Sequence, residues 1–205
     1  MIDVYLETGA KRVFACAVDW PGLARSGRDA DSALEALEQY RARYLGVVAL
    51  ADEGAPTGAL RVVATVAGDG TTDFGAPNVV PDLDRSSVTP AAAARLAALV
   101  EACWSALDAV VARAPESLRR GPRGGGRDRD EVFRHVTAAE AAYARKLGVR
   151  HKEPKDATAV SALRADLAVA LATPDPTSAW PLPYAARRIG WHVLDHAWEI
   201  EDKSV

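Results

Sequence analysis

Hydrophobic residues in the first third of the chain recur at every second position in two short stretches. MIDVYLE (1–7) and RVFACAV (12–18) have a period of two, which predicts two half-buried strands. Pro21 and Gly22 supply turn chemistry after the second stretch. ALRVVATVAG (59–68) predicts a further strand that closes the unit.

Between these strands the period lengthens to that of a helix. The stretch from Asp31 carries an amphipathic stripe, and Asp31 itself is the expected N-cap because its carboxylate can accept a free N–H of the first turn. The stripe consists of Leu34, Leu37, Tyr40 or Arg41, Tyr44 and Leu45. The pattern therefore predicts a small β-β-(β)-α-β unit over residues 1–68.

The remaining chain predicts helices only. Residues 69–88 are rich in Gly, Pro, Asp, Ser and Thr without a sustained period, which indicates a linker. Four amphipathic stretches follow, and Thr89 is the expected N-cap of the first. They cover about 90–114, 128–147, 157–172 and 184–203. The expected fold class is α+β with two domains, the second an antiparallel four-helix bundle over residues 89–205.

Composition narrows the class of protein. Hydrophobic residues make up 49% and charged residues 26% of the 205 residues, as in soluble globular proteins. A formal net charge of −3 argues against a nucleic-acid partner. The N-terminus does not resemble a signal peptide, and no window reaches the roughly 18 to 20 apolar residues of a membrane span. We expect a cytoplasmic protein without membrane contact, in which Cys16 and Cys103 are buried and reduced.

Two of the four histidines, His192 and His196, stand four residues apart in the last predicted helix. This spacing places both on one helix face, where they could bind one metal ion. Four histidines scattered at random over the chain would give a pair at this spacing about 6% of the time, so the spacing alone does not decide. The alternative is a pair of core imidazoles hydrogen-bonded to carbonyl groups.

Two resemblances bear on the choice. AVDWPGLARSGRDADSALEALEQY (17–40) resembles the HicB-like domain, with its Pro-Gly turn followed by an acidic, Ala/Leu-rich helix. EVFRHVTAAEAAY (131–143) and GWHVLDHAWEI (190–200) resemble the DinB/YfiT-like four-helix bundles. The second resemblance implies a three-histidine site formed by His135, His192 and His196.

The chemistry of such a site follows from its ligands. Three neutral imidazoles with open coordination positions suit Zn²⁺ or Ni²⁺ better than Mg²⁺ or Ca²⁺. The DinB-like resemblance implies a metal-dependent transferase or isomerase that uses a low-molecular-weight thiol such as mycothiol or bacillithiol, or a hydrolase. Its partner would be a small molecule that the sequence does not identify.

The roles of other residues near the histidines can also be predicted. Glu131 and Glu199 could orient a ligand imidazole or be solvated charges. Asp195 is expected at the surface, and His151 is expected outside the site, in a loop. Trp191, Leu194 and Trp198 form a separate stripe that favours core packing.

Two further groups of charged residues stand out in the sequence. The arginines of LRRGPRGGGRDRD (118–130) could hold an anionic ligand, or the segment could be a plain connection between helices. The acids of the first unit, Asp3, Glu7 and Asp19, are expected to face solvent.

The alternative function is a non-catalytic binding or regulatory protein whose HicB-like part recognises a partner. HicB antitoxins commonly carry a DNA-binding segment after the α/β unit, and here the predicted bundle takes that place. A homodimer formed through a sheet edge is compatible with the pattern.

Overall fold

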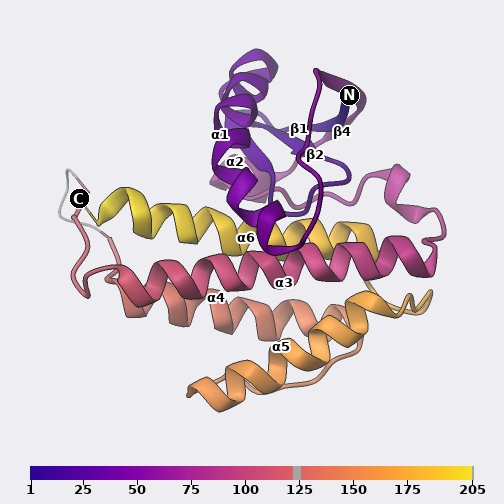
Figure 1. Ribbon diagram of the computed structural model, residues 1–205. Helices are drawn as coiled ribbons and strands as arrows, with labels where there is room; N and C mark the ends of the chain where they lie inside the picture. The colour runs from indigo at the N-terminus through magenta and orange to yellow at the C-terminus, as the bar shows by residue number, and fades with distance from the viewer. Residues whose placement is uncertain (122–125, 205) are drawn as a thin grey trace.

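A computed structural model describes residues 1–121 and 126–204 of the chain (Figure 1). The fold is α+β, as predicted. Its four strands are β1 (Ile2–Thr8), β2 (Val13–Ala17), β3 (Ala24–Gly27) and β4 (Leu60–Ala67). Six α-helices lie in the described residues: α1 (Ala30–Leu50), α2 (Gly70–Phe74), α3 (Pro90–Arg113), α4 (Arg129–Ala144), α5 (Ala157–Ala172) and α6 (Leu182–Lys203). Short 3-10 helices are η1 (Asp82–Arg85) and η2 (Arg145–Leu147).

The strands form one mixed sheet in the order β3-β2-β1-β4. β1 pairs with β2, and β2 with β3, in antiparallel fashion, whereas β1 and β4 are parallel. A parallel neighbour requires a crossover connection, and α1 provides it. Because β4 comes last in the order, it is an edge strand, and most of its residues are exposed.

Both faces of the two central strands are buried, so the prediction of half-buried strands is wrong. The alternation itself is correct. Val4 and Ala15 lie in the main hydrophobic core with residues of α1, whereas Phe14 and Cys16 belong to a second cluster with Trp191 of α6. The rings of Phe14 and Trp191 are 5.8 Å apart. A period of two predicts which residues share a face, but the helix that covers the second face comes from the far end of the chain.

The N-cap of helix α1 lies two residues earlier than predicted. Asp29, not Asp31, is the N-cap, and its side chain accepts a hydrogen bond from Ser32 N while the Ser32 hydroxyl bonds back in a capping box. Asp31 lies in the first turn, where its charge suits the helix dipole. Leu45, predicted in the apolar stripe, is 45% exposed. The stripe therefore follows Leu37 and Tyr44, which are buried.

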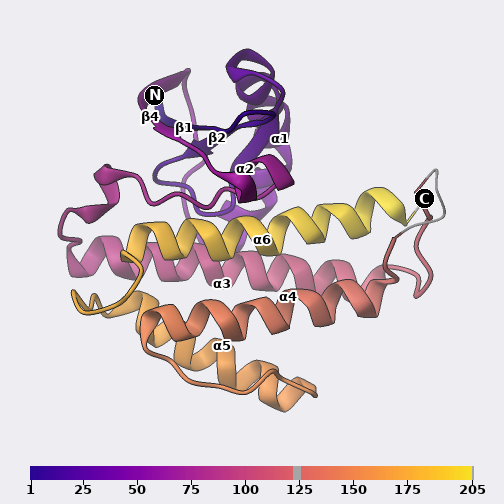
Figure 2. The same cartoon turned by 180° about the vertical axis from the view of Figure 1, so that it is seen from behind.

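Four long helices, α3 to α6, lie side by side beneath the sheet and α1 (Figures 1 and 2). Local signals set their ends, and the expected cap Thr89 is among them. Thr89 caps α3 with Pro90 in its first turn, Gly148 in a left-handed conformation follows η2, and Asp156 caps α5.

The directions of the helices differ from a simple antiparallel bundle. In both views α4 and α5 run the same way, opposite to α3 and α6. The connection over residues 148–156 makes this possible, because nine extended residues span about 30 Å. The 16 residues of α5 rise only about 24 Å. The chain can therefore return along the bundle before α5 begins.

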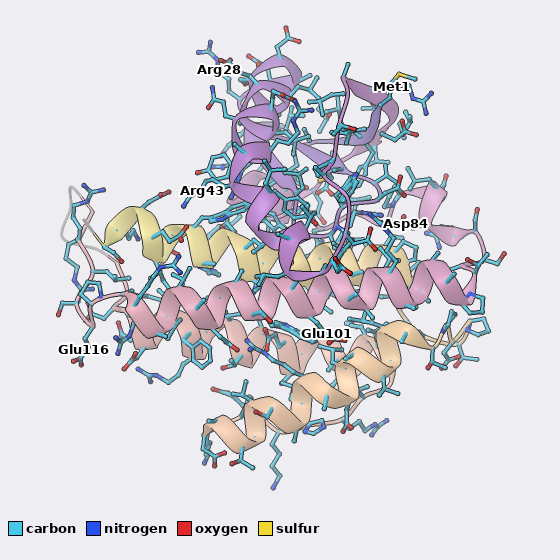
Figure 3. The ribbon with its side chains drawn as sticks, in the orientation of Figure 1. Met1, Arg28, Arg43, Asp84, Glu101 and Glu116 are labelled. Atoms are coloured by element: carbon cyan, nitrogen blue, oxygen red, sulfur yellow. The ribbon has the colours of Figure 1, made fainter. Side chains whose placement is uncertain are left out.

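The segment predicted as a linker, residues 69–88, contains α2 and η1 and is bonded to both β1 and α6. The Glu7 carboxylate on β1 accepts hydrogen bonds from the backbone N–H groups of Asn78 and Val79. Asp84 (labelled in Figure 3) pairs with Arg187 of α6. Glu7 is fully buried, so its expected exposure to solvent was wrong. None of the described helices combines the length and apolar character needed to cross a bilayer.

Candidate metal centre

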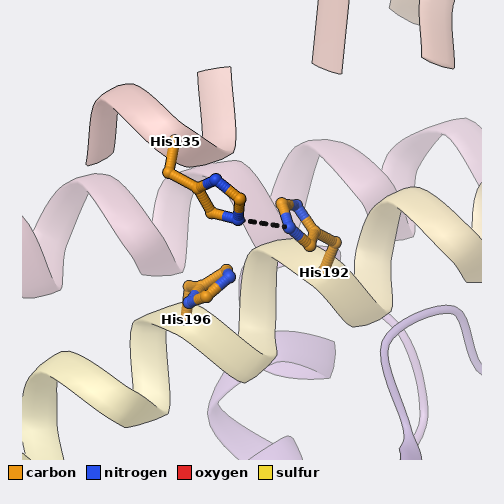
Figure 4. Close-up of side chains that lie close together, drawn as sticks. All are labelled: His135, His192 and His196. Atoms are coloured by element: carbon orange, nitrogen blue, oxygen red, sulfur yellow. Dashed lines mark hydrogen bonds between the residues drawn. The ribbon is translucent and has the colours of Figure 1, made fainter. Parts of the chain in front are cut away.

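Helix α6 runs between the sheet and α4 and presents a different face to each. Gly190 lies against the turn at Pro21 and Gly22, and Trp191 packs on the sheet. One position later His192 points to α4, and His196 follows one turn further along the same face (Figure 4). The helix can hold this position because nearly all of its first fifteen residues are at least partly buried.

Helix α4 supplies the third histidine. Asp128 and Glu131 form a capping box that starts the helix, and Val132 and Val136 anchor it in the core. His135 lies between these two anchors and faces α6. Two separate helices thus direct the imidazoles of His135, His192 and His196 to one point.

The three rings are close enough to share an ion. One potential ligand atom of each histidine lies within 4.8 Å of the other two. His192 Nε2 and His135 Nε2 are 3.3 Å apart, as the dashed line in Figure 4 marks. The ring centroid of His196 is 4.9 Å from that of His135 and 4.7 Å from that of His192.

These distances fit a divalent ion. Two nitrogens that each lie about 2.0 to 2.1 Å from one tetrahedral ion are about 3.3 Å from each other. The separation of the two Nε2 atoms has this value. The donor set, three imidazole nitrogens, is the one that borderline transition metals prefer.

Burial prepares the histidines for metal binding. His192 is 7% exposed, and desolvation, followed by the nearby His196 and Arg188, holds its pKa well below the usual value of 6.5. Desolvation and His196 also lower the pKa of His135. Only the neutral imidazole offers a lone pair, so both residues are in the binding form at neutral pH.

The third imidazole is fixed by a carboxylate. His196 Nδ1 lies 2.7 Å from Glu199 Oε2, and Lys203 bonds the other carboxylate oxygen. The hydrogen bond from His196 lowers the pKa of Glu199 to about 2, so the carboxylate is charged. A carboxylate on Nδ1 leaves Nε2 free for a metal and sets the ring orientation. Of the two predicted orienting acids, Glu199 has this contact, whereas the Glu131 side chain is used in the helix cap.

The other residues that the sequence analysis considered have structural roles outside the histidine cluster. Asp195 pairs with Arg25, and His151 pairs with Asp166 away from the cluster. The apolar stripe of α6 is buried, as expected: Trp191, Leu194 and Trp198.

The arginine-rich loop is partly outside the described residues, which omit 122–125. Arg120 pairs with Asp128, and Arg119 donates to the Asp202 carbonyl at the end of α6. These two arginines therefore fasten the loop. Arg127 contributes to the lowered pKa of His135 and His192, so its positive charge acts on the site.

Sequence reasoning missed Tyr143. It lies eight residues after His135, two turns along the same face of α4, and its ring is 5.7 Å from that of His192. This spacing was visible in the sequence. Together with Trp180, whose ring centroid is 5.4 Å away, Tyr143 forms an aromatic wall beside the histidines.

A large cavity of the described chain lies away from the histidines. It has a volume of about 840 Å³ and lies between α3, α4 and α5, beside Phe133, Trp104 and Arg164. His135 faces the opposite side of α4, toward α6. We place the candidate site at the histidines because the donor geometry, not cavity size, is specific for an ion.

The chain matches no protein-family model, no curated protein and no solved structure. The HicB-like and DinB-like resemblances therefore remain expectations from the sequence motifs.

Proposed function

We propose that this chain is a divalent-metal protein of the DinB-like kind, in which His135, His192 and His196 hold Zn²⁺ or Ni²⁺. The observation that carries the proposal is the convergence of three imidazole nitrogens from two helices within 4.8 Å of one another. The 3.3 Å between the Nε2 atoms of His135 and His192 suits a shared ion and equally allows a hydrogen bond between two neutral rings, and the metal content decides between the two.

The proposed activity is thiol-dependent transfer or isomerisation, with hydrolysis as the other reaction open to the same centre. A bound ion of this class lowers the pKa of a coordinated thiol or water and leaves it ionised at neutral pH. Burial keeps His192 and His135 neutral, and Glu199 orients the ring of His196. The thiol or water would approach between α4 and α6, where His135 and His196 are partly exposed.

The two-part organisation belongs to the same proposal. Residues 1–68 would form the HicB-like unit and residues 89–205 the DinB-like bundle. The sheet with α1, and the four long helices, support this division in outline.

Metal content tests the proposal. Protein purified without a metal-binding tag is expected to contain about one Zn or Ni per chain by elemental analysis. His135→Ala, His192→Ala and His196→Ala should each lower that content at least tenfold, because two remaining imidazoles rarely suffice. His151→Ala is the matched control and should retain the metal, because His151 pairs with Asp166 outside the cluster.

One result would overturn the proposal. Protein that is purified without metal, and whose melting temperature does not respond to added Zn²⁺ or Ni²⁺, has no site of this kind. Loss of metal in His151→Ala as well would show that the content reflects surface binding.

A second candidate function rests on β4. This edge strand exposes Val62 and Val63, which are 44% and 45% exposed, and an apolar edge of this kind pairs readily with another strand. A partner bound there, including a second copy of the chain, would make the first unit a recognition module. This binding should persist in the three histidine variants, whereas a metal-dependent activity should not.

A further inference from the structure

Arg188 differs from the other buried arginines of the described chain. Arg164 is paired with Glu140 and Asp108, and Arg187 with Asp84. Arg188 is only 9% exposed, and no described carboxylate forms a salt bridge with it. Its buried Nη1 atom has no hydrogen-bond partner among the described residues.

Aromatic rings do not replace the missing anion. The guanidinium carbon lies 5.0 Å from the ring centroid of Tyr143 and 4.8 Å from that of Trp191. Such contacts offset part of the desolvation of a cation, but they leave its hydrogen-bond donors unused. A buried guanidinium without a counter-ion is costly, which makes Arg188 a candidate for a functional role.

Arg188 also has a defined position relative to the histidines. It precedes His192 by four residues, so the two side chains share a face of α6, about 6 Å apart along the helix axis. Its charge lowers the pKa of His192, and Tyr143 contacts both residues. The unused donors are therefore one helical turn from the candidate metal centre.

We propose that Arg188 binds the acidic group, a carboxylate or a phosphate, of the small molecule that this site takes. The ligand class is thus an organic anion that places a metal-binding atom, such as a thiol sulfur, a few bonds from its acidic group. Only the attachment of the metal-binding atom rests on the proposed metal site. The anion subsite itself stands on Arg188.

The first test uses metal-free protein, so that it does not depend on metal binding. Titration calorimetry with succinate and, separately, with inorganic phosphate should show saturable binding of one of them, which identifies the acidic group. Arg188→Met should weaken that binding at least about tenfold, because it removes a charge-assisted hydrogen bond. Arg150→Gln, at an exposed position, changes net charge equally and should leave the affinity unchanged.

The second test uses the Co²⁺-loaded protein and the absorbance of the cobalt–thiolate bond. The unmodified chain should bind 3-mercaptopropionate at least about tenfold more tightly than 2-mercaptoethanol, and Arg188→Met should abolish the preference. Failure to bind Co²⁺ would count against the metal proposal alone, because the metal-free titrations still decide the role of Arg188.

Stability separates a binding role from a structural one. Because Arg188 has no counter-ion, Arg188→Met should leave the melting temperature unchanged or raise it by about 2 to 4 °C. An unstable or unfolded Arg188→Met variant would show that the guanidinium supports the fold, and would overturn the proposal. Equal affinity for the anions with and without Arg188 would overturn it as well.

Discussion

At the scale of single residues, burial decides what each ionisable side chain can do. His192 and His151 have the same imidazole, but His192 is buried beside two other histidines and Arg188, whereas His151 pairs with Asp166 near the surface. The first environment favours a neutral ring with a free lone pair, whereas in the second a carboxylate occupies the Nε2 atom. Only the first environment also brings the ligand nitrogens of several histidines together.

The cysteines give a prediction at the same scale. Cys16 and Cys103 are both buried, and desolvation raises the pKa of Cys16 to about 12 and that of Cys103 further. At pH 8 a thiol with a pKa of 12 is ionised to only about one part in 10⁴, and the thiolate is the reactive form. We expect no reaction with Ellman's reagent in the native protein over minutes. Two thiols per chain should react after unfolding in guanidinium. A fast thiol in the native protein would show that one of these side chains reaches solvent.

Sequence reasoning reached the three histidines but not the state of their neighbours. The spacing of His192 and His196 fixed their common face, and the resemblance of residues 131–143 added His135. No sequence pattern distinguishes Arg188, which lacks a partner, from Arg187, which pairs with Asp84 more than one hundred residues earlier. Pairing over such a separation depends on the fold and cannot be read from local spacing.

At the scale of secondary-structure elements, the position of α6 depends on a glycine. A methyl group at Gly190 would lie 2.9 Å from Gly22 N and 3.0 Å from Pro21 C. Both are backbone atoms, in a turn where Gly22 has a φ of +95°, so the turn cannot yield cheaply. Helix propensity favours alanine over glycine by about 1 kcal/mol, but overpacking of this kind costs about 1 to 3 kcal/mol.

We therefore expect Gly190→Ala to lower the free energy of unfolding in urea by up to about 2 kcal/mol, the overpacking cost less the gain in propensity. Gly46→Ala is the matched control in α1, where a methyl group would meet nothing within 4 Å. That variant should be more stable than the unmodified chain by about 0.5 to 1 kcal/mol. Equal effects of the two substitutions would contradict the close contact between α6 and the turn.

The ends of the helices were predictable, whereas their directions were not. Thr89, Gly148 and Asp156 act on their own turn of backbone, so sequence alone located the ends of α3, η2 and α5 to within a residue or two. The common direction of α4 and α5 depends on the path of residues 148–156, which have no periodic pattern. A short loop would have forced antiparallel neighbours, but this one is long enough for either direction.

At the scale of the whole molecule, the two predicted units share one core. A single cluster of buried residues includes Val4 of β1, Tyr44 of α1, Leu107 of α3 and Leu194 of α6. Arg43 of α1 (labelled in Figure 3) also pairs with Glu201 and Asp202 of α6. The sequence suggested separate domains because the period of the pattern changes at about residue 68. Helix α6 packs on the sheet and on α3. The change of period at about residue 68 therefore does not mark a break in the hydrophobic core.

The segment 69–88 is held to the sheet by Glu7, and this contact makes stability depend on pH. Desolvation raises the pKa of Glu7 above its usual 4.5, although hydrogen bonds from Thr72 and from the Asn78 and Val79 N–H groups act in the opposite direction. A raised pKa means that the folded state binds a proton more tightly than the unfolded state. The contribution of Glu7 is therefore complete below about pH 4.5 and decreases as the pH rises through the folded-state pKa.

Glu7→Gln removes this titration while keeping the shape of the side chain. Comparison of urea unfolding at several pH values should show the unmodified chain losing stability relative to the variant above pH 4.5. The loss should be about 1.4 kcal/mol for each pH unit until the folded-state pKa is passed. All other ionisable groups are the same in both proteins, so their effect cancels in the difference. A difference that instead grows in favour of the unmodified chain with rising pH would mean that the three hydrogen-bond donors outweigh burial. Glu7 would then hold residues 69–88 as a charged group.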